Sequence, residues 1–185
     1  MLHGFGETYH HLYKHFEKHL PDDFGVFAPN GIFPLPQKKF DSPDWKLRFC
    51  WYFYDAAKKE YFIDQRYPAE VISNLITQLK LDQNKKMIIG FSQGGYLAPF
   101  LGNKLSHVEK CIAINAEYKH LMLPKICPFP LINICGEKDD IVDSANCKNS
   151  HQKMIERGNH GDFIEVAEEG HSLGPNLIQA TLNYI

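Results

Sequence analysis

The sequence predicts an α/β fold built on a mostly parallel, doubly wound sheet that helices cover on both faces. Short runs of nearly continuous apolar residues alternate along the chain with longer amphipathic stretches. Apolar runs without polar alternation are typical of strands buried on both faces, and strands that alternate with helices form open parallel sheets. A third observation is the segment Gly90-Phe91-Ser92-Gln93-Gly94, which joins one such apolar run to a helical pattern.

We expect five strands and five helices. The strands are expected where short apolar runs occur, at residues 25–28, 87–90, 111–115, 131–135 and 163–167. The helices are expected at the amphipathic stretches 8–20, 68–79, 96–105, 144–157 and 175–185. Pro21 would end the first helix, and Pro68 suits the first turn of the second. The aromatic-rich segment 29–64 is expected to lie as loops and short turns over the face that carries the site.

The N-terminal part of this sheet is short of residues. A strand should lead into His3 and Gly4 and lie between residues 25–28 and 87–90, yet only Met1 and Leu2 are there to form it. A gap at that point would expose hydrogen-bonding edges in the middle of the core. Either residues precede Met1 or the sheet is short there. We expect the first, with the first strands of the sheet absent from this sequence.

Composition is that of an ordinary globular domain. A chain of 185 residues with 44% apolar residues suits one domain spanning residues 1–185. The net charge of −2 and the scattered basic pairs argue against a nucleic-acid partner. No apolar stretch approaches the ~20 residues that span a bilayer, and no secretory signal is visible. Five cysteines without a Cys-x-x-Cys pair fit free thiols in a reducing, cytoplasmic setting.

Ser92 has the setting of a nucleophile. The glycines two residues before and after it, Gly90 and Gly94, allow a sharp strand-to-helix turn that holds a serine in a strained backbone conformation. Its hydroxyl would then project at the N-terminus of the following helix, where free N–H groups and the helix dipole favour developing negative charge. The Gly-x-Ser-x-Gly pattern also occurs by chance, so its position between strand and helix is what indicates a hydrolase.

A serine nucleophile needs a base that takes its proton and a carboxylate that orients the base. Asp139 is our candidate acid, with Asp140 as the alternative, because both follow an apolar strand at the sheet edge where ligands collect. His171 is the candidate base, preceded by Gly170 in a loop after the last strand. The alternative interpretations are a helix cap or solvated turn for Asp139 and an exposed loop histidine for His171.

Two backbone amides are candidates for binding a tetrahedral oxyanion. One is the N–H of Gln93, which follows the nucleophile directly. The other is the N–H of Phe5, in the glycine-rich segment Leu-His-Gly-Phe-Gly-Glu at residues 2–7. Removal of one such donor typically costs about 2.7–4 kcal/mol of transition-state stabilisation.

Four segments together resemble the phospholipase/carboxylesterase family of α/β-hydrolases, which includes acyl-protein thioesterases and small bacterial carboxylesterases. They are Leu-His-Gly-Phe-Gly-Glu at 2–7, Gly-Phe-Ser-Gln-Gly-Gly at 90–95, Gly-Glu-Lys-Asp at 136–139 and Gly-His-Ser at 170–172. The resemblance runs in order over nearly the whole chain. The sequence departs from the family pattern at Glu7 and Glu137, where aspartate is usual, and at Asp140, where proline is common.

Residue by residue, the resemblance implies a catalytic set and one substrate-binding residue. It implies Ser92 as nucleophile, Asp139 as its carboxylate, His171 as base, and the amides of Phe5 and Gln93 as oxyanion donors. The stretch Cys-Trp-Tyr-Phe-Tyr-Asp at 50–55 is similar to the family's Ser-Trp-Phe-Asp stretch near the acyl pocket, which implies that Trp51 contacts substrate.

Two further patterns are open to interpretation. The aromatic residues between Phe40 and Phe62 would either line a groove for an acyl chain or plug the loops onto the core. His11, His15 and His19 recur at helical spacing, and residues 15–19 faintly resemble the His-Glu-x-x-His helix of zinc proteases. Glu17 is one place off from that pattern and no third ligand is signalled, so we interpret the histidines as a solvated helix face. We expect no metal.

The sequence therefore predicts a cytoplasmic serine hydrolase that cleaves carboxylic esters of small or medium acyl groups through an acyl-enzyme. Its expected partner is a small acyl ester or thioester, without any cofactor, nucleic acid or stable membrane insertion. An acyl-protein thioesterase or lysophospholipase is the alternative within enzymes, and a catalytically silent, hydrolase-like binding protein is the alternative of another class. The residues leave acyl length, leaving group and homodimer formation open.

Overall fold

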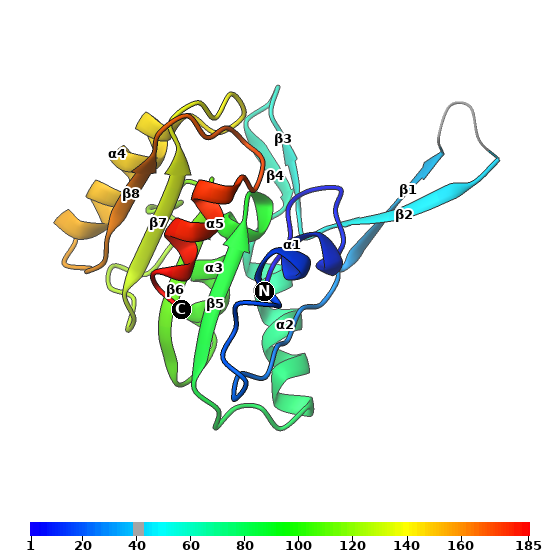
Figure 1. The fold of residues 1–185 in the computed structure, drawn as a ribbon, viewed down its shortest axis with the longest axis horizontal. Helices are drawn as coiled ribbons and strands as arrows, with labels where there is room; N and C mark the ends of the chain where they lie inside the picture. Colours follow the sequence, from blue (N-terminus) through cyan, green and yellow to red (C-terminus); the bar gives the residue numbers. More distant parts are fainter. Residues whose placement is uncertain (39–42) are drawn as a thin grey trace.

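The computed structural model describes residues 1–38 and 43–185 and has a four-stranded sheet at its centre (Figure 1). The strands lie side by side in chain order: β5 (Lys86–Phe91), β6 (Val108–Ile114), β7 (Leu131–Gly136) and β8 (Phe163–Val166). Every neighbouring pair is parallel. The predicted α/β class and the four predicted strands between residues 87 and 167 are therefore confirmed.

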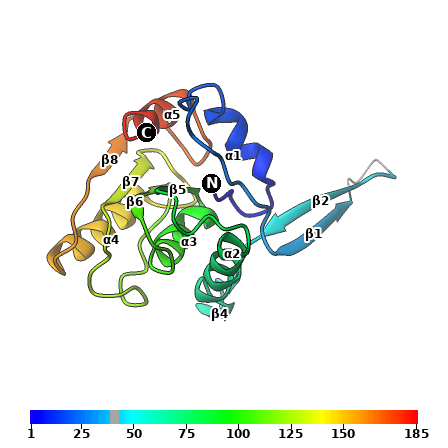
Figure 2. The same cartoon turned by 90° about the horizontal axis from the view of Figure 1, so that it is seen from below.

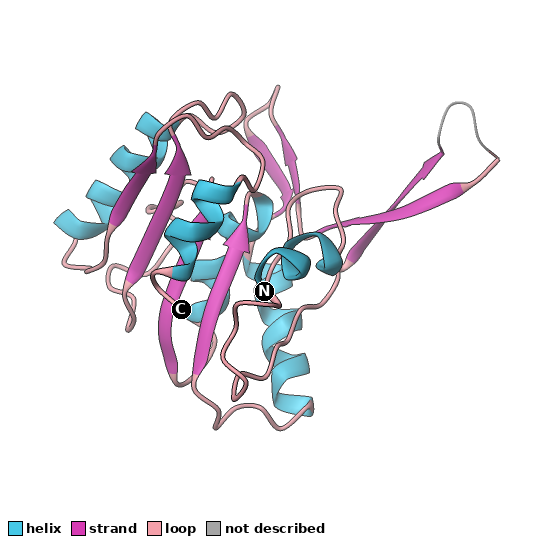
Figure 3. Cartoon of the chain, in the orientation of Figure 1, coloured by secondary structure: helices cyan, strands magenta, loops and turns pink. Residues whose placement is uncertain are grey.

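Helices cover both faces of this sheet (Figures 2 and 3). On one face lie α1 (Tyr9–Phe16) and α5 (Pro175–Leu182), and on the other lie α2 (Arg66–Gln78), α3 (Gln93–Gly102) and α4 (Ser144–Glu156). All five predicted helices are present, although α1 ends earlier than expected because its last core residue is Phe16 and residues 17–19 are exposed. Within the described ranges, no helix combines the length and apolarity needed to cross a membrane.

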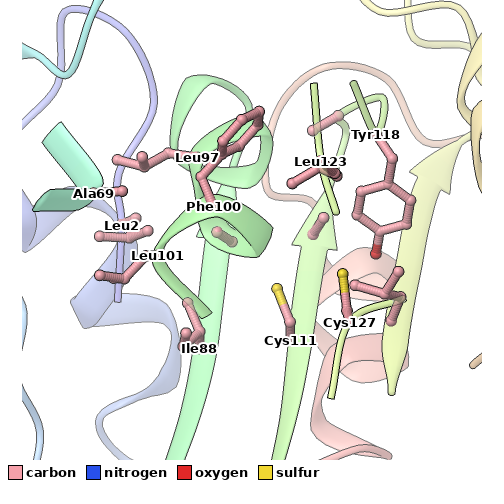
Figure 4. Close-up of a cluster of buried hydrophobic side chains, with 14 of the residues drawn as sticks. Leu2, Ala69, Ile88, Leu97, Phe100, Leu101, Cys111, Tyr118, Leu123 and Cys127 are labelled. Carbon is pink, nitrogen blue, oxygen red and sulfur yellow. The ribbon is translucent and has the colours of Figure 1, made fainter. Parts of the chain in front are cut away.

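Burial on both faces explains the continuous apolar runs of the strands. Ile88 packs toward α2 and α3, whereas its neighbour Ile89 packs toward α1 and α5. The same division recurs along β6 and β7. Figure 4 shows the first of these two clusters, in which Leu2 lies with Ala69, Leu97 and Leu101 beside α3. Because both faces of the sheet are buried, the strands lack the alternation of apolar and polar residues that marks a strand with one exposed face.

The predicted strand at residues 25–28 is wrong, because that segment forms no strand. Leu2 alone occupies the place beside β5. Its N–H donates to the carbonyl of Ile89 at 2.8 Å, and its own carbonyl accepts from the N–H of Phe91 at 3.0 Å. Leu2 forms a single bridge and not a strand. Residues 25–28 therefore have no neighbouring strand to pair with, and they remain irregular.

A cavity of about 720 Å³ lies between this irregular segment and the outer edge of β5. Met1 and Phe27 both line this cavity, and the Met1 amine donates to the Phe27 carbonyl at 2.7 Å. Most of its lining is apolar and comes from the 20–27 segment, α2 and the first half of β5. Within residues 1–38 and 43–185, the outer edge of β5 is thus partnered only near its C-terminal end, through Leu2.

The segment 29–64 also differs from the expectation of loops and short turns. It forms two antiparallel hairpins, one of β1 (Phe33–Lys38) and β2 (Trp45–Cys50) and one of β3 (Phe53–Asp55) and β4 (Glu60–Ile63). The first hairpin projects from the body of the molecule (Figure 1). This hairpin was not predicted because the sequence of β1 contains Pro34 and Pro36. Proline argues against a strand, since it is tolerated only where no ladder N–H is needed. Phe40 lies outside the described residues.

A close backbone contact joins the N-terminal loop to α3. A Cβ atom on Gly94 would lie 2.1 Å from the carbonyl oxygen of Leu2 and 2.7 Å from that of His3. Both obstacles are backbone atoms, so no side-chain rotation could relieve the clash. Only glycine at position 94 lets α3 begin against the 2–7 segment.

We expect Gly94→Ala to lower the free energy of unfolding by about 2 kcal/mol or more, because overpacking a rigid contact forces the backbone apart. The matched control is Gly25→Ala, whose added Cβ would meet no atom within 4 Å. That control should stay within about 0.5 kcal/mol of wild type. Urea denaturation of the three proteins makes the comparison, and equal stability of the two variants would contradict the contact.

Candidate active site

Ser92 lies at the turn between β5 and α3, in a backbone conformation that side chains rarely adopt. Its φ is 50° and its ψ is −119°, and its N–H donates to the carbonyl of Ile114 at 2.8 Å. Such conformations cost of order 1–3 kcal/mol and persist where the surroundings enforce them. Here the enforcing contact is tight, since a Cβ on Gly90 would lie 2.2 Å from the Gly94 carbonyl oxygen. The spacing of the two glycines around Ser92 follows from this turn.

The structure brings three of the predicted side chains into one hydrogen-bonded chain. The Oγ of Ser92 lies 2.9 Å from Nε2 of His171. The other ring nitrogen, Nδ1, lies 2.8 Å from Oδ2 and 3.0 Å from Oδ1 of Asp139. Since a carboxylate can only accept, Nδ1 carries the hydrogen and Nε2 is left to accept from the serine hydroxyl.

The carboxylate of Asp139 is held from two directions. Its side chain is entirely buried, and its Oδ1 accepts the backbone N–H groups of Ile141 at 2.9 Å and Val142 at 2.8 Å. The turn-forming interpretation of Asp139 therefore holds together with its contact to the imidazole. Asp140, the alternative acid, is exposed, and the structure pairs His171 with Asp139 instead.

Asn115 connects the loops that carry the acid and the histidine. Its Oδ1 accepts the N–H of Gly136 at 2.9 Å, and its Nδ2 donates to the carbonyl of Gly170 at 2.9 Å. Asn115 is wholly buried at the end of β6, between the two loops. The sequence predicted Asn115 only as the last residue of a strand, so its role in joining the two loops was missed. The one sign of that role in the sequence is a polar residue at the end of an apolar run.

The amides of Phe5 and Gln93 are the predicted oxyanion donors, and both residues lie close to Ser92 in the fold. Gln93 is the first residue of α3, where helix N–H groups have no intrahelical partner. Phe5 lines the same cavity as Ser92. Within residues 1–38 and 43–185, no protein acceptor pairs with either amide. Among the described residues both amides are thus left without a protein acceptor, and that of Gln93 is at the positive end of the α3 dipole.

His3 anchors the loop that carries Phe5. Its Nε2 accepts the N–H of Gly31 at 2.8 Å, so Nδ1 carries the hydrogen and donates to the Gly4 carbonyl at 2.7 Å. The His3 carbonyl in turn accepts the indole N–H of Trp51 at 2.8 Å. Burial lowers the pKa of His3 to about 4, which keeps the ring neutral and suits this one-donor, one-acceptor arrangement.

Trp51 lies elsewhere than expected for a substrate contact. Its side chain is entirely buried, and it is not among the residues that line the cavity at Ser92. Its backbone N–H donates to Oε1 of Gln93 at 2.8 Å, and Nε2 of Gln93 donates to the carbonyl of Tyr52 at 2.9 Å. The buried indole of Trp51 supports the 2–7 loop through its bond to the His3 carbonyl. The expectation that Trp51 contacts substrate is therefore corrected to a structural role.

Ser92 opens into a cavity of about 390 Å³ with mixed walls. The apolar wall residues include the exposed side chains of Phe5 and Ile141. The full lining is Gly4, Phe5, Glu7, His11, Phe91, Ser92, Ile141, His171 and Ser172. No described aromatic residue of the 29–64 segment contributes, so this cavity is not the acyl groove considered for that segment.

Sequence analysis missed Glu7 and His11 as cavity residues. Nε2 of His11 lies 3.2 Å from Oε1 of Glu7, one helical turn away. The rings of His11 and His15 meet edge to face, with centroids 5.9 Å apart. In the part of the chain that the structure describes, no cluster of three metal-ligating side chains occurs. The helical histidine spacing was visible in the sequence, but its contact with Glu7 depends on the loop geometry.

Acid should destabilise this protein through His3. In the unfolded chain the imidazole has its ordinary pKa of 6.5, so the unfolded state takes up a proton first as the pH falls. Stability that is complete above pH 6.5 is therefore lost progressively toward pH 4. We expect the free energy of unfolding to fall by about 3 kcal/mol more between pH 7 and pH 4 in wild type than in His3→Gln. Urea titrations at both pH values test this, and equal losses in the two proteins would contradict it.

Comparisons with known proteins agree with this architecture. The sequence profile of the phospholipase/carboxylesterase family matches residues 1–185. Among curated proteins, no sequence matches the chain. Solved structures with the same fold include esterase PE8, with 20% identity, a TM-score of 0.76, and coverage of 99% of this chain and 88% of that one.

Two further structures extend the comparison. A carboxylesterase from Mesorhizobium loti has 16% identity and a TM-score of 0.75, covering 99% of this chain and 85% of that one. SOBER1 from Arabidopsis thaliana has 15% identity and a TM-score of 0.70, covering 99% of this chain and 94% of that one. At these identities the structural likeness establishes the α/β-hydrolase fold, and the full-length profile match establishes the family. The chain belongs to the phospholipase/carboxylesterase family.

Proposed function

We propose that this protein is a serine hydrolase that cleaves carboxylic esters of small or medium acyl groups through an acyl-enzyme. One observation carries the proposal: the unbroken hydrogen-bonded chain from Ser92 through His171 to the buried carboxylate of Asp139. Membership in an esterase family supports the same reaction class.

In the first half of the reaction, Nε2 of His171 takes the proton of the Ser92 hydroxyl as the oxygen attacks the acyl carbonyl. The carboxylate of Asp139 keeps the hydrogen of the imidazole on Nδ1 and stabilises the imidazolium that forms. The buried position of Asp139 strengthens this electrostatic contact, and its bonds to Ile141 and Val142 hold it still.

The tetrahedral oxyanion is bound by the amides of Phe5 and Gln93. His171 then donates its proton to the leaving alcohol, which departs and leaves an acyl ester on Ser92. Water enters, loses a proton to His171 and releases the acid by the reverse sequence. Preorganised amides are effective here because they need no reorientation as charge develops.

The proposed acyl size rests on the cavity at Ser92. A volume of about 390 Å³, with Phe5 and Ile141 exposed at its edge, suits a short or medium apolar chain. Ligand pockets in general begin at about 300 Å³, so this one lies near the small end of the range.

We expect Ser92→Ala to abolish labelling by a fluorophosphonate probe and to lower kcat by about 10³-fold or more. Asp139→Asn should lower kcat by about 10⁴-fold, because the amide no longer holds the correct imidazole tautomer. The matched control is Asp140→Asn, an adjacent and exposed aspartate, which should stay within about threefold of wild type. A folded wild-type protein that the probe does not label would favour the silent binding protein.

Esters and thioesters of the same acyl group give the same acyl-enzyme, so the preference between them is found only by comparing their rates of turnover. We expect kcat/KM for p-nitrophenyl esters of four to eight carbons, roughly the range that the cavity admits, to exceed that for the corresponding sixteen-carbon ester by about tenfold or more. Acyl thiols of matched chain length measure the thioester preference in the same assay. Faster turnover of long-chain acyl thioesters would instead assign a thioesterase.

A further inference from the structure

Glu7 ends the loop that carries Phe5, and its carboxylate turns back onto that loop. Oε2 accepts the N–H of Gly4 at 2.8 Å, and Oε1 lies 3.2 Å from Nε2 of His11. The side chain is 18% exposed and lines the cavity at Ser92. A single carboxylate thus spans the loop from its last residue to the residue before Phe5.

Backbone contacts fix the far side of the loop but not Phe5 itself. The Gly6 N–H donates to the Phe49 carbonyl at 2.9 Å, and the Phe49 N–H donates to the Glu7 carbonyl at 3.0 Å. These bonds tie positions 6 and 7 to β2. On the near side, the His3 ring accepts from Gly31 and donates to the Gly4 carbonyl. On the other side of Gly4, its N–H donates to the Glu7 carboxylate, the acceptor found for it in the described part of the chain.

The fit around this bond is close. A Cβ on Gly4 would lie 3.0 Å from Oε2 of Glu7 and 3.2 Å from the Phe91 ring. Gly6 has a φ of 68°, a left-handed conformation that turns the chain back over Phe5. The loop is therefore a tight turn in which two flexible glycines flank Phe5, and the Glu7 carboxylate closes it.

We propose that Glu7 is a positioning residue, which holds the Phe5 N–H at the orientation that the oxyanion requires. The inference rests on the proposed function and adds to it a residue that, together with His3, fixes one oxyanion donor. The Phe5 N–H shares one peptide plane with the Gly4 carbonyl, which the His3 ring holds from one side. The Glu7 carboxylate holds the N–H on the other side of Gly4, so the two hydrogen bonds together limit the rotation that a glycine would otherwise allow. Charge-assisted hydrogen bonds of this kind are about twice as strong as neutral ones.

A purely structural role for Glu7 predicts a different result. If the carboxylate served only α1, through its pair with His11, its loss would lower stability and leave the chemistry of the folded enzyme unchanged. A positioning role instead lowers kcat while KM stays near its wild-type value, because the Phe5 amide acts mainly on charge that develops in the transition state.

The test compares Glu7→Ala, Glu7→Gln and the control Glu17→Ala, which removes an exposed glutamate at the other end of α1. We expect Glu7→Ala to lower kcat by about 10–100-fold with KM changed less than about threefold, the size of a displaced rather than deleted donor. Glu7→Gln keeps an oxygen that accepts from Gly4 and should recover most of kcat. Glu17→Ala should match wild type within about twofold.

A second readout uses an alkyl trifluoromethyl ketone, whose adduct with the Ser92 oxygen carries an oxyanion. Its affinity should fall in Glu7→Ala by the same factor as kcat/KM, and thermal melts establish that each variant is folded. Wild-type kcat in folded Glu7→Ala, or a loss confined to KM, would overturn the inference. So would a Glu7→Gln variant as slow as Glu7→Ala. A wild-type enzyme inert to both ester and fluorophosphonate would instead contradict the proposed function itself.

Discussion

The site depends on one backbone contact, the approach of the Leu2 and His3 carbonyls to Gly94. Because this contact leaves no room for a Cβ, the N-terminal loop lies directly against the first turn of α3. Leu2 also bonds to Ile89 and Phe91, the strand residues that lead into Ser92. The nucleophile and the loop with the Phe5 amide therefore share one backbone anchor, and neither can move without the other.

The second constraint is the parallel sheet, which brings distant residues to one edge. Ser92, Asp139 and His171 follow β5, β7 and β8, whose carboxyl ends meet at the same edge. β6 is followed by Asn115 rather than by a reacting group, and that residue joins the loops that follow β7 and β8. Within the described residues, the buried carboxylate of Asp139 and the amide of Asn115 both have hydrogen-bond partners, as buried polar groups require.

Sequence analysis predicted the features that are set by local pattern. The turn at Ser92 and the apolar strands of the sheet are determined by residues that are neighbours in the sequence, so local sequence patterns were enough to predict them. The choice of Asp139 over Asp140 was also predicted, but only the folded loop shows why, since its amides of Ile141 and Val142 enclose the first carboxylate. Family membership, first indicated by a resemblance, is established by the profile match.

The remaining features depend on partners far away in the chain. Residues 25–28 have strand character but no strand to pair with, and the β1–β2 hairpin is concealed by its prolines. Trp51 resembled a substrate contact in its local motif, yet its indole bonds to His3, 48 residues away. Glu7 differed from the family pattern by one methylene, and nothing in the sequence revealed its bond to Gly4.

Rapid-quench mass spectrometry of the enzyme during turnover of a p-nitrophenyl ester tests the account most directly. The account predicts that one acyl group accumulates on the peptide that contains Ser92 and disappears as the acid is released. Hydrolysis without any acylated peptide, or acylation of a residue other than Ser92 at the rate of turnover, would contradict it.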